Sequence, residues 1–242
     1  MLIIGVDLAW GETKSDGVCF IRTAGRGPAR RAVVAGFAYP QGDDALAAAI
    51  AAELRGDEAA LATIDAPIVC PNLTGARPVD RLTHTLFHRE HAACHPANLT
   101  KCPRPPRVLA RLQADLGFTA GWATGPKAPR RQAAEVYPHP AMVRLFGLSR
   151  IIKYKKGRVA DRRLEFVRLQ GLIRAFCAAE LPSLDLGPES EAWLTAPWAK
   201  PAEDRVDALF CALIGLWHVQ HAGRRSEVIG DAQTGFILLP KS

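Results

Sequence analysis

The sequence predicts an α/β protein with a mixed sheet flanked by helices. Three apolar stretches, at 2–8, 17–22 and 31–38, follow one another through short connections, which is typical of an antiparallel meander. A helical stretch at 43–56 begins with Asp and is followed by Gly, and it leads into a fourth apolar stretch at 61–67. A strand–helix–strand passage of this kind predicts a parallel crossover.

We expect a single domain over residues 1–242 that carries a helical insertion. Residues 68–131 contain two helical patterns, around 78–93 and 106–116, separated by loop-like stretches such as KCPRPPR and TGPKAPRR. This segment interrupts the series of strands, so we expect it to form an insertion or a lid. The stretch TAGRGPAR at 23–30 is rich in glycine, as a loop between the second and third strands should be.

The second half of the chain is predicted to supply one more strand and most of the helices. The stretch QAAEVYP at 132–138 has the pattern of a fifth strand that ends at its proline. Helices are predicted at 139–147 and 158–180, and a long, strongly apolar helix at 201–221. The stretches EVIG and GFILLP predict a small closing hairpin.

Composition points to a protein that meets anionic partners. The net charge is +7 and the computed pI is about 9.3, which suits nucleic acid or a nucleotide, although an excess of arginine also serves solubility. The N-terminus lacks the pattern of a secretory signal and no apolar run reaches the length of a membrane span. The six cysteines are scattered without a CxxC pair. We therefore expect a cytoplasmic protein with reduced thiols and no membrane partner.

Five acidic residues fall where functional side chains would be expected. Asp7 ends the first strand, Asp65 ends the fourth in TIDAP, and Glu135 lies in the fifth in AEVYPHP. Asp204 and Asp207 stand three residues apart near the start of the last long helix, so they share one face of it. Because the carboxyl ends of adjacent parallel strands meet at one edge of a sheet, several of these carboxylates should converge.

Converging carboxylates need a cation, and hard oxygen ligands favour Mg²⁺ or Mn²⁺. Asp7, Asp65, Asp204 and Asp207 are the predicted metal ligands, and Glu135 joins them as a candidate catalytic residue. Simpler explanations remain open for each residue. Acids in a first helical turn are favoured by the helix dipole, an Asp before Ala-Pro can make a turn, and Glu135 can pair with a buried arginine.

At this point the sequence resembles a known family. The stretches IIGVDLAWG, TIDAPI, AEVYPHPA and EDRVDALFCAL look like the motifs of the predicted nuclease family called domain of unknown function 429, which is related to RuvC-like resolvases. The resemblance implies an RNase H-like fold with a five-stranded mixed sheet of order 3-2-1-4-5. It also implies first-strand, fourth-strand and final-helix metal ligands at Asp7, Asp65 and Asp207. Asp204 matches the position one turn earlier, where the family has an acid or a histidine, and Glu135 has no assigned counterpart. RuvC-like enzymes often work as dimers, so the resemblance also implies a homodimer.

Basic and aromatic residues close to these motifs are candidates for substrate binding. Lys155, Lys156 and Arg158 flank Gly157 in KYKKGR, a loop that suits a phosphate group, and Trp10 could stack on a base. Further candidates from the insertion are Arg77, Arg81 and His95. A solvated loop and ordinary packing are the alternatives for these residues. The segment 84–102 also holds four histidines and two cysteines whose spacing permits a zinc ion, but no CxxC or HExxH accompanies them.

Three functions follow from these observations. The leading prediction is a metal-dependent nuclease that hydrolyses phosphodiester bonds of DNA or RNA with Mg²⁺ or Mn²⁺. The second is an ATPase or phosphotransferase of the actin-like type, which shares an Asp on its first strand but usually needs two such domains. The third is a non-catalytic module that binds nucleic acid or a nucleotide by charge. A pure binding module should keep its affinity in the presence of a chelator.

Overall fold

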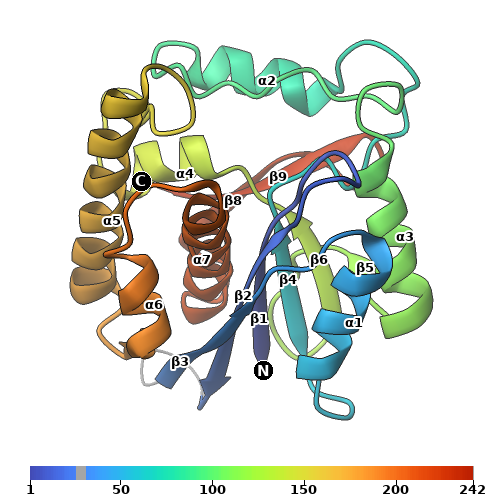
Figure 1. Cartoon of the computed structure of the whole chain (residues 1–242). Coiled ribbons are helices and arrows are strands. Elements are labelled where there is room, and N and C mark those ends of the chain that lie inside the picture. Colours follow the sequence, from blue (N-terminus) through green and yellow to red (C-terminus); the bar gives the residue numbers. More distant parts are fainter. Residues whose placement is uncertain (26–30, 242) are drawn as a thin grey trace.

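A computed structural model describes residues 1–25 and 31–241, and in it a central sheet is covered by helices on both faces (Figure 1). The predicted loop at 23–30 lies largely outside the described residues. The strands are β1 (Leu2–Asp7), β2 (Gly17–Ala24), β3 (Arg31–Ala38), β4 (Ala60–Ile64), β5 (Thr119–Ala120), β6 (Arg131–Glu135), β7 (Leu184–Asp185), β8 (Ser226–Asp231) and β9 (Gly235–Pro240). The helices are α1 (Asp43–Glu53), α2 (Pro78–Phe87), α3 (Arg104–Leu116), α4 (Pro138–Leu145), α5 (Val159–Glu180), α6 (Gly187–Trp193) and α7 (Lys200–Gln220).

The sheet differs from the predicted five-stranded one. Within the described residues it has seven strands in the order β5-β6-β4-β1-β2-β3-β7. The prediction of five strands in the order 3-2-1-4-5 was wrong as stated, because β5 and β7, each of two residues, pair in parallel onto the two edges. β1, β2 and β3 form the expected antiparallel meander, and β4 joins β1 in parallel as the crossover predicts. Most of the strand pairs are parallel.

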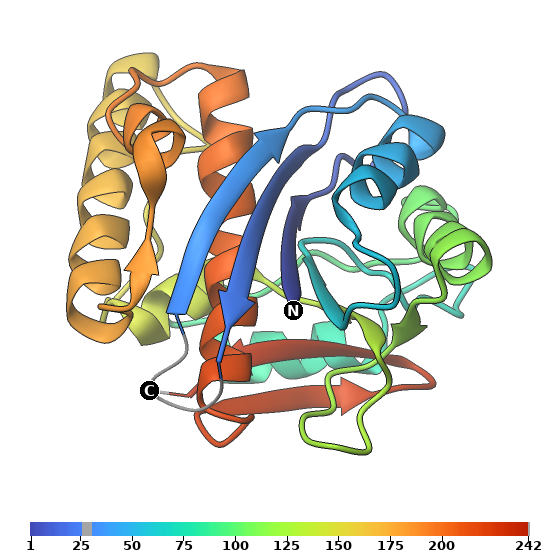
Figure 2. The same ribbon diagram turned by 90° about the horizontal axis from the view of Figure 1, so that it is seen from below.

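Alternate residues of the strands supply two separate cores. Leu2, Ile4 and Val6 of β1 pack with apolar residues of α1 and α3 on one face of the sheet. Ile3 faces the opposite core, which contains α7 and the inner side of α5. Figure 2 shows the two sets of helices on opposite sides of the sheet. The period of two along β1 thus explains a sheet that is covered on both faces.

Helix α7 lies unusually close to the sheet, because glycines replace side chains at the contact. A Cβ atom on Gly5 of β1 would stand 2.1 Å from the carbonyl oxygen of Ala208. A Cβ atom on Gly17 would stand equally close, at 2.1 Å, to the carbonyl oxygen of Asp204. Thr63 of β4 strengthens the contact, since its hydroxyl donates to the carbonyl oxygen of Cys211 at 2.8 Å. The first turns of α7 are therefore held against the ends of β1 and β2.

The segment 68–131 was predicted to be an insertion or a lid, and its two helices lie in different places. Its helix α3 belongs to the layer beside α1, where Val108, Leu109 and Leu112 are buried. Helix α2 crosses the end of the sheet at which β1 finishes (Figure 1) and packs on the β8–β9 hairpin. Only this second part has the position of a lid. Across the described residues, no helix combines the length and the apolar character that crossing a membrane requires.

Candidate functional site

Asp7, Asp65 and Asp207 come together at one end of the sheet. Asp7 is the last residue of β1, and Asp65 follows the last residue of β4, the parallel neighbour of β1. The backbone N–H of Asp65 donates to the carbonyl oxygen of Val6 at 2.8 Å, which keeps the two strand ends in register. Asp207 lies two turns into α7 and its side chain is fully buried. The convergence predicted from the sequence is present for these three residues.

The centre of this carboxylate cluster is taken by a lysine. The ammonium nitrogen of Lys155 lies 2.8 Å from Oδ2 of Asp207 and 4.0 Å from Oδ1 of Asp7. The side chain of Lys155 keeps 29% of its surface exposed, whereas that of Asp7 keeps 15%. Lys155 was predicted to hold phosphate from a mobile loop, but in this structure it neutralises acids. One ammonium cannot balance three ionised carboxylates.

Asp207 is oriented by a buried tyrosine. The hydroxyl of Tyr154 donates to Oδ1 of Asp207 at 2.6 Å, and Tyr154 itself is completely buried. The other oxygen, Oδ2 of Asp207, lies 2.8 Å from the ammonium nitrogen of Lys155. Both oxygens of this buried carboxylate are therefore engaged, one by a hydroxyl group and one by an ammonium group.

The pKa values of the acids in the cluster reflect their burial and the charges around them. Burial raises the pKa of Asp65 to about 7, with the ammonium of Lys155 opposing the shift and Asp207 adding to it. Burial likewise raises the pKa of Asp7, again against the effect of Lys155 and with that of the neighbouring acids. Burial alone would lower the pKa of Lys155, but Asp207 and the other acids raise it. Lys155 therefore stays charged, while the acids lack sufficient positive charge.

Asp204 is held apart from this cluster. Its Oδ2 accepts a hydrogen bond of 2.7 Å from the hydroxyl of Tyr39, and its Oδ1 lies 2.6 Å from the ammonium nitrogen of Lys200. Lys200 also contacts Glu203 in the same first turn of α7. Both oxygens of Asp204 are thus engaged by other groups. Asp204 and Asp207 were predicted to act together because they stand three residues apart. In the structure Asp207 lies inside the cluster and Asp204 lies beside it.

A divalent cation fits the chemistry of these residues but has no prepared position. Among the described residues, no group of three His, Cys, Asp or Glu side chains is arranged to hold a metal ion. Asp7, Asp65 and Asp207 nevertheless offer the oxygen donors that Mg²⁺ and Mn²⁺ prefer. The charge of three carboxylates around the single ammonium group of Lys155 is what such an ion would balance.

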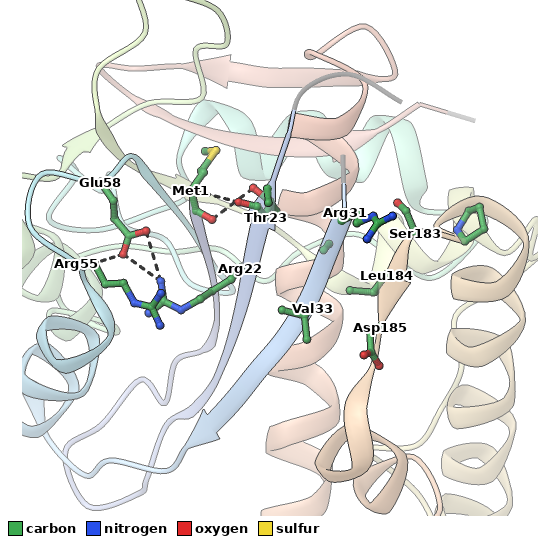
Figure 3. Close-up of a pocket in the computed structure, with 13 residues that line it drawn as sticks. Met1, Arg22, Thr23, Arg31, Val33, Arg55, Glu58, Ser183, Leu184 and Asp185 are labelled. Carbon is green, nitrogen blue, oxygen red and sulfur yellow. Dashed lines mark hydrogen bonds and ion pairs between the residues drawn. The ribbon is translucent and has the colours of Figure 1, made fainter. Parts of the chain in front are cut away.

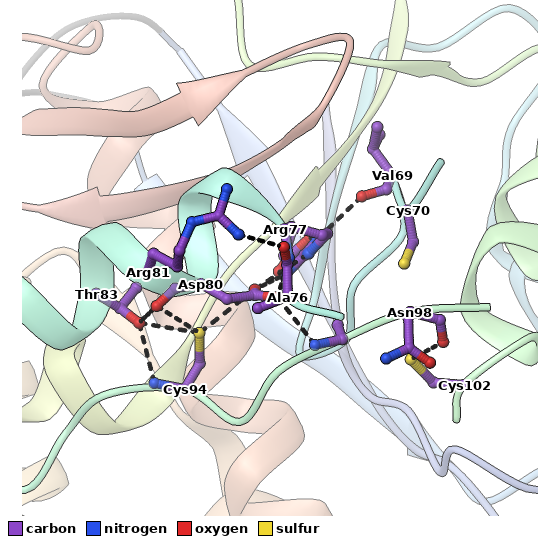
Figure 4. Close-up of polar contacts among 12 residues, drawn as sticks. Val69, Cys70, Ala76, Arg77, Asp80, Arg81, Thr83, Cys94, Asn98 and Cys102 are labelled. Atoms are coloured by element: carbon purple, nitrogen blue, oxygen red, sulfur yellow. Dashed lines mark hydrogen bonds and ion pairs between the residues drawn. The ribbon is translucent and has the colours of Figure 1, made fainter. Parts of the chain in front are cut away.

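Glu135 belongs to a separate buried network around Arg77. Figure 4 shows the contacts of Arg77 with Val69 and Asp80 in this network. Arg77 donates to both oxygens of Glu135 at 2.7 Å and to Oδ1 of Asp80 at 2.9 Å, and it also donates to the carbonyl oxygen of Val69. The side chain of Arg77 is only 2% exposed. Of the two roles considered for Glu135, its contacts match that of a partner for a buried arginine. Arg77, predicted to bind substrate, has its donors occupied inside the protein.

A small cavity of about 80 Å³ lies beside Asp65. Trp10, His95 and Tyr137 line it, with Arg77 and Glu135 at its wall. Trp10 and His95 are exposed, so both can meet a ligand that reaches Asp65. Trp10, Arg77 and His95, which the sequence predicted to bind substrate, therefore share one cavity next to the carboxylate cluster.

The remaining predicted substrate contacts lie on the surface. Lys156 and Arg158 are exposed on the loop that carries Lys155, and Arg81 is exposed on α2, where it donates to the carbonyl oxygen of Ala76 at 2.7 Å. In the histidine-rich segment, His84 and His88 are exposed on the outer side of α2.

The two cysteines of the segment 84–102 lie in different surroundings. The sulfur of Cys94 lies 3.0 Å from the hydroxyl oxygen of Thr83, as Figure 4 shows, while that of Cys102 donates to the carbonyl oxygen of Asn98. Burial raises the pKa of the Cys94 thiol to about 12, so this sulfur stays protonated at neutral pH. A nucleophilic role would require the thiolate.

A larger hollow of about 660 Å³ lies at the opposite end of the sheet (Figure 3). Met1 lines it, and because Met1 precedes β1 the hollow is a full strand length from Asp7. Arg22, one of three arginines that line it, is paired with Glu53 and Glu58. Among the described residues, Glu58 and Asp185 are the acids that line this hollow.

Sequence reasoning missed the groups that orient the acids. Tyr154 and Tyr39 hold Asp207 and Asp204, yet tyrosines in these positions have no sequence signal apart from their neighbours KK and PQG. His139, in the AEVYPHP motif, packs edge-on against Tyr137 and Tyr154. Burial lowers the pKa of His139 to about 3, so a neutral imidazole lies beside the cluster, and its Nδ1 has no hydrogen-bond partner among the described residues.

The fold and the site together define a mixed α/β protein with a carboxylate–lysine cluster at the end of its central strands. The profile of the family described as protein of unknown function (DUF429) matches residues 5–234. The chain belongs to this family. Searches among curated proteins and among solved structures found no match.

Proposed function

We propose that the chain is a metal-dependent nuclease of RNase H-like fold that hydrolyses phosphodiester bonds of DNA or RNA. The observation that carries the proposal is the convergence of Asp7, Asp65 and Asp207 from three different elements on one point. The order β3-β2-β1-β4-β6 of the five longer strands, with a meander followed by parallel strands, supports the choice of fold. The basic charge of the chain suits a polyanionic substrate.

In this proposal each residue of the cluster has a separate task. Asp7, Asp65 and Asp207 hold Mg²⁺ or Mn²⁺, and the bound ion supplies stabilisation of the charge that develops on the phosphate. Tyr154 fixes the orientation of Asp207 through its 2.6 Å hydrogen bond. Hydrolysis adds water across one P–O bond, so the phosphorus gains an oxygen and the leaving oxygen gains a proton.

The surroundings of the cluster suit a nucleotide chain. Trp10 and Tyr137 offer aromatic faces at the cavity beside Asp65, and bases stack on such faces without regard to sequence. Lys156 and Arg158 are exposed on the neighbouring loop, where they can meet phosphate groups on either side of the cleaved bond. We propose the same contacts for DNA and RNA.

A second candidate function is favoured by the ion pair itself. Because Lys155 already contacts Asp207 and lies near Asp7, the cluster is partly neutralised without any metal. A module that binds nucleic acid without cleaving it would need no more than this. Its affinity for nucleic acid would be the same in EDTA and in Mg²⁺, whereas a nuclease would cleave only in the presence of metal.

The test combines calorimetry with cleavage assays on the same samples. The wild type is titrated with Mg²⁺ and Mn²⁺ and incubated with labelled single-stranded and double-stranded DNA and RNA. Asp7→Asn and Asp207→Asn should lose both metal binding and cleavage. Asp57→Asn is the matched control, because Asp57 precedes β4 at the far end of the sheet and its side chain is 80% exposed. Absence of metal binding in the wild type, with nucleic acid present, would overturn the proposal.

A further inference from the structure

Lys155 supplies the positive charge that the carboxylates of the cluster need. A divalent cation bound by the same carboxylates would need the same position. Its ammonium nitrogen is 2.8 Å from Asp207 and 4.0 Å from Asp7, and the charge of Asp65 also acts on it. A metal ion held by these carboxylates would require the same oxygens. Two positive centres within one such cluster repel each other strongly at these distances.

The structure also gives Lys155 a way out of the cluster. Its side chain is 29% exposed, and Lys156 and Gly157, which follow it, are exposed as well. The preceding residue, Tyr154, is buried and hydrogen-bonded, so the backbone stays anchored while the four-carbon side chain can rotate. Asp207 keeps its hydrogen bond from Tyr154 whether or not the lysine side chain is present beside it.

We infer that Lys155 is a built-in counter-ion that occupies the cation position of the metal-free protein, and that a divalent metal ion must displace its ammonium group in order to bind. This inference rests on the proposed function, since it assumes that the carboxylates take a metal. Lys155 acts here as a positioning residue that stabilises the carboxylates before the metal arrives. The displaced ammonium remains tethered at the same end of the sheet, close to where the substrate phosphate would lie.

The inference predicts that removing the ammonium strengthens metal binding. Mn²⁺ binding is measured by calorimetry for the wild type, Lys155→Met and Lys155→Arg. Lys155→Met should bind Mn²⁺ about tenfold or more tightly, because it loses a close charge competitor, whereas Lys155→Arg keeps the charge and should not. Lys153→Met is the matched control, since Lys153 is exposed on the same loop and has no place in the cluster. Its affinity should equal that of the wild type.

A second measurement follows the lysine itself. The full-length wild type is treated with an amine-acylating reagent in EDTA and in saturating Mn²⁺, and each lysine is quantified by mass spectrometry. Lys155 should be protected in EDTA and become labelled in Mn²⁺, while Lys153 is labelled equally in both. Protection that persists in Mn²⁺ would overturn the displacement.

The outcomes separate this inference from the function on which it rests. If neither the wild type nor Lys155→Met binds Mn²⁺, the metal-dependent function fails and the inference fails with it. If the wild type binds Mn²⁺ and Lys155→Met binds it equally or more weakly, only the inference is overturned. Binding by Lys155→Met alone would show that the metal ion does not displace the lysine of the natural chain, and it would overturn both the inference and the metal-dependent function.

Discussion

The buried network of Arg77, Glu135 and Asp80 allows a prediction in which charge balance decides the cost of a substitution. One guanidinium faces two carboxylates, and the side chains of all three are at most 5% exposed. Asp80 has further donors, since its Oδ2 accepts the backbone N–H groups of Arg77 and Ala97, both at 2.9 Å. Glu135 has only the two 2.7 Å bonds from Arg77 among its hydrogen bonds in the described residues.

Removing the arginine should therefore cost more than neutralising the glutamate. Arg77→Met leaves Glu135 without a donor in the interior, and breaking a buried pair in this way costs about 3–5 kcal/mol of unfolding free energy. Glu135→Gln leaves Arg77 paired with Asp80 and keeps an amide oxygen as an acceptor. Its cost should be about 1–2 kcal/mol, because one of the two bonds from Arg77 is lost and the other keeps a neutral amide oxygen as its acceptor.

The assay is urea unfolding at pH 7.5, followed by circular dichroism, with the slope of the transition compared between variants. The double variant Arg77→Met/Glu135→Gln should be more stable than the sum of the single effects predicts, because the stranded charge is gone. Equal costs for Arg77→Met and Glu135→Gln would refute the argument from charge balance. Loss of cleavage in a stable Glu135→Gln protein would instead return Glu135 to the catalytic role predicted from the sequence.

Three further predictions concern the central contact and the cluster. Gly5→Ala should cost about 3 kcal/mol or more in urea unfolding, since its Cβ would meet the backbone of α7, whereas Gly171→Ala, which faces open space on α5, should stabilise by about 0.5–1 kcal/mol. In EDTA, the contribution of Asp65 to the free energy of unfolding should fall as the pH rises from about 4 to about 7, because its pKa of about 7 makes it bind more protons in the folded than in the unfolded chain. His139, with its pKa lowered to about 3, acts in the opposite direction, so the Asp65 contribution is taken as the difference between wild type and Asp65→Asn in urea titrations at several pH values. Tyr154→Phe should cost about 1–3 kcal/mol by calorimetric unfolding, because Asp207 loses its 2.6 Å bond; an unchanged melting temperature would contradict this.

Strong hydrophobic periods made most of the helices and strands predictable. The expected helix at 201–221 is α7 (Lys200–Gln220), and the expected hairpin is β8 with β9. The strands β5 and β7 have two residues each and therefore carry no period. Helix α6 (Gly187–Trp193) is a short element of the same kind, with only Ser190 buried. Such short elements form through contacts with segments that are distant in the sequence, and a local hydrophobic pattern does not reveal those contacts.

At the site, strand ends were predictable and side-chain partners were not. Asp7 and Asp65 meet because β1 and β4 are parallel neighbours, which the order of elements already implies. Asp204 and Asp207 are about 60° apart around the helix axis, enough for different partners to capture each one. Lys155 looked like part of a solvated loop, because nothing in KYKKGR shows that Tyr154 is drawn into the core. That placement arises from packing between distant segments.

The close contact of α7 with β1 also affects the order in which parts of the chain can fold during synthesis. β1 leaves the ribosome long before α7, yet Gly5 packs against this helix, which begins only at Lys200. Until that helix is synthesised, one face of β1 lacks its cover and Asp7 lacks Asp207. A nascent chain can therefore form the meander early, but it assembles the acidic cluster only after α7 has been made. Metal binding by this site would thus report that a growing chain has been extended through Asp207.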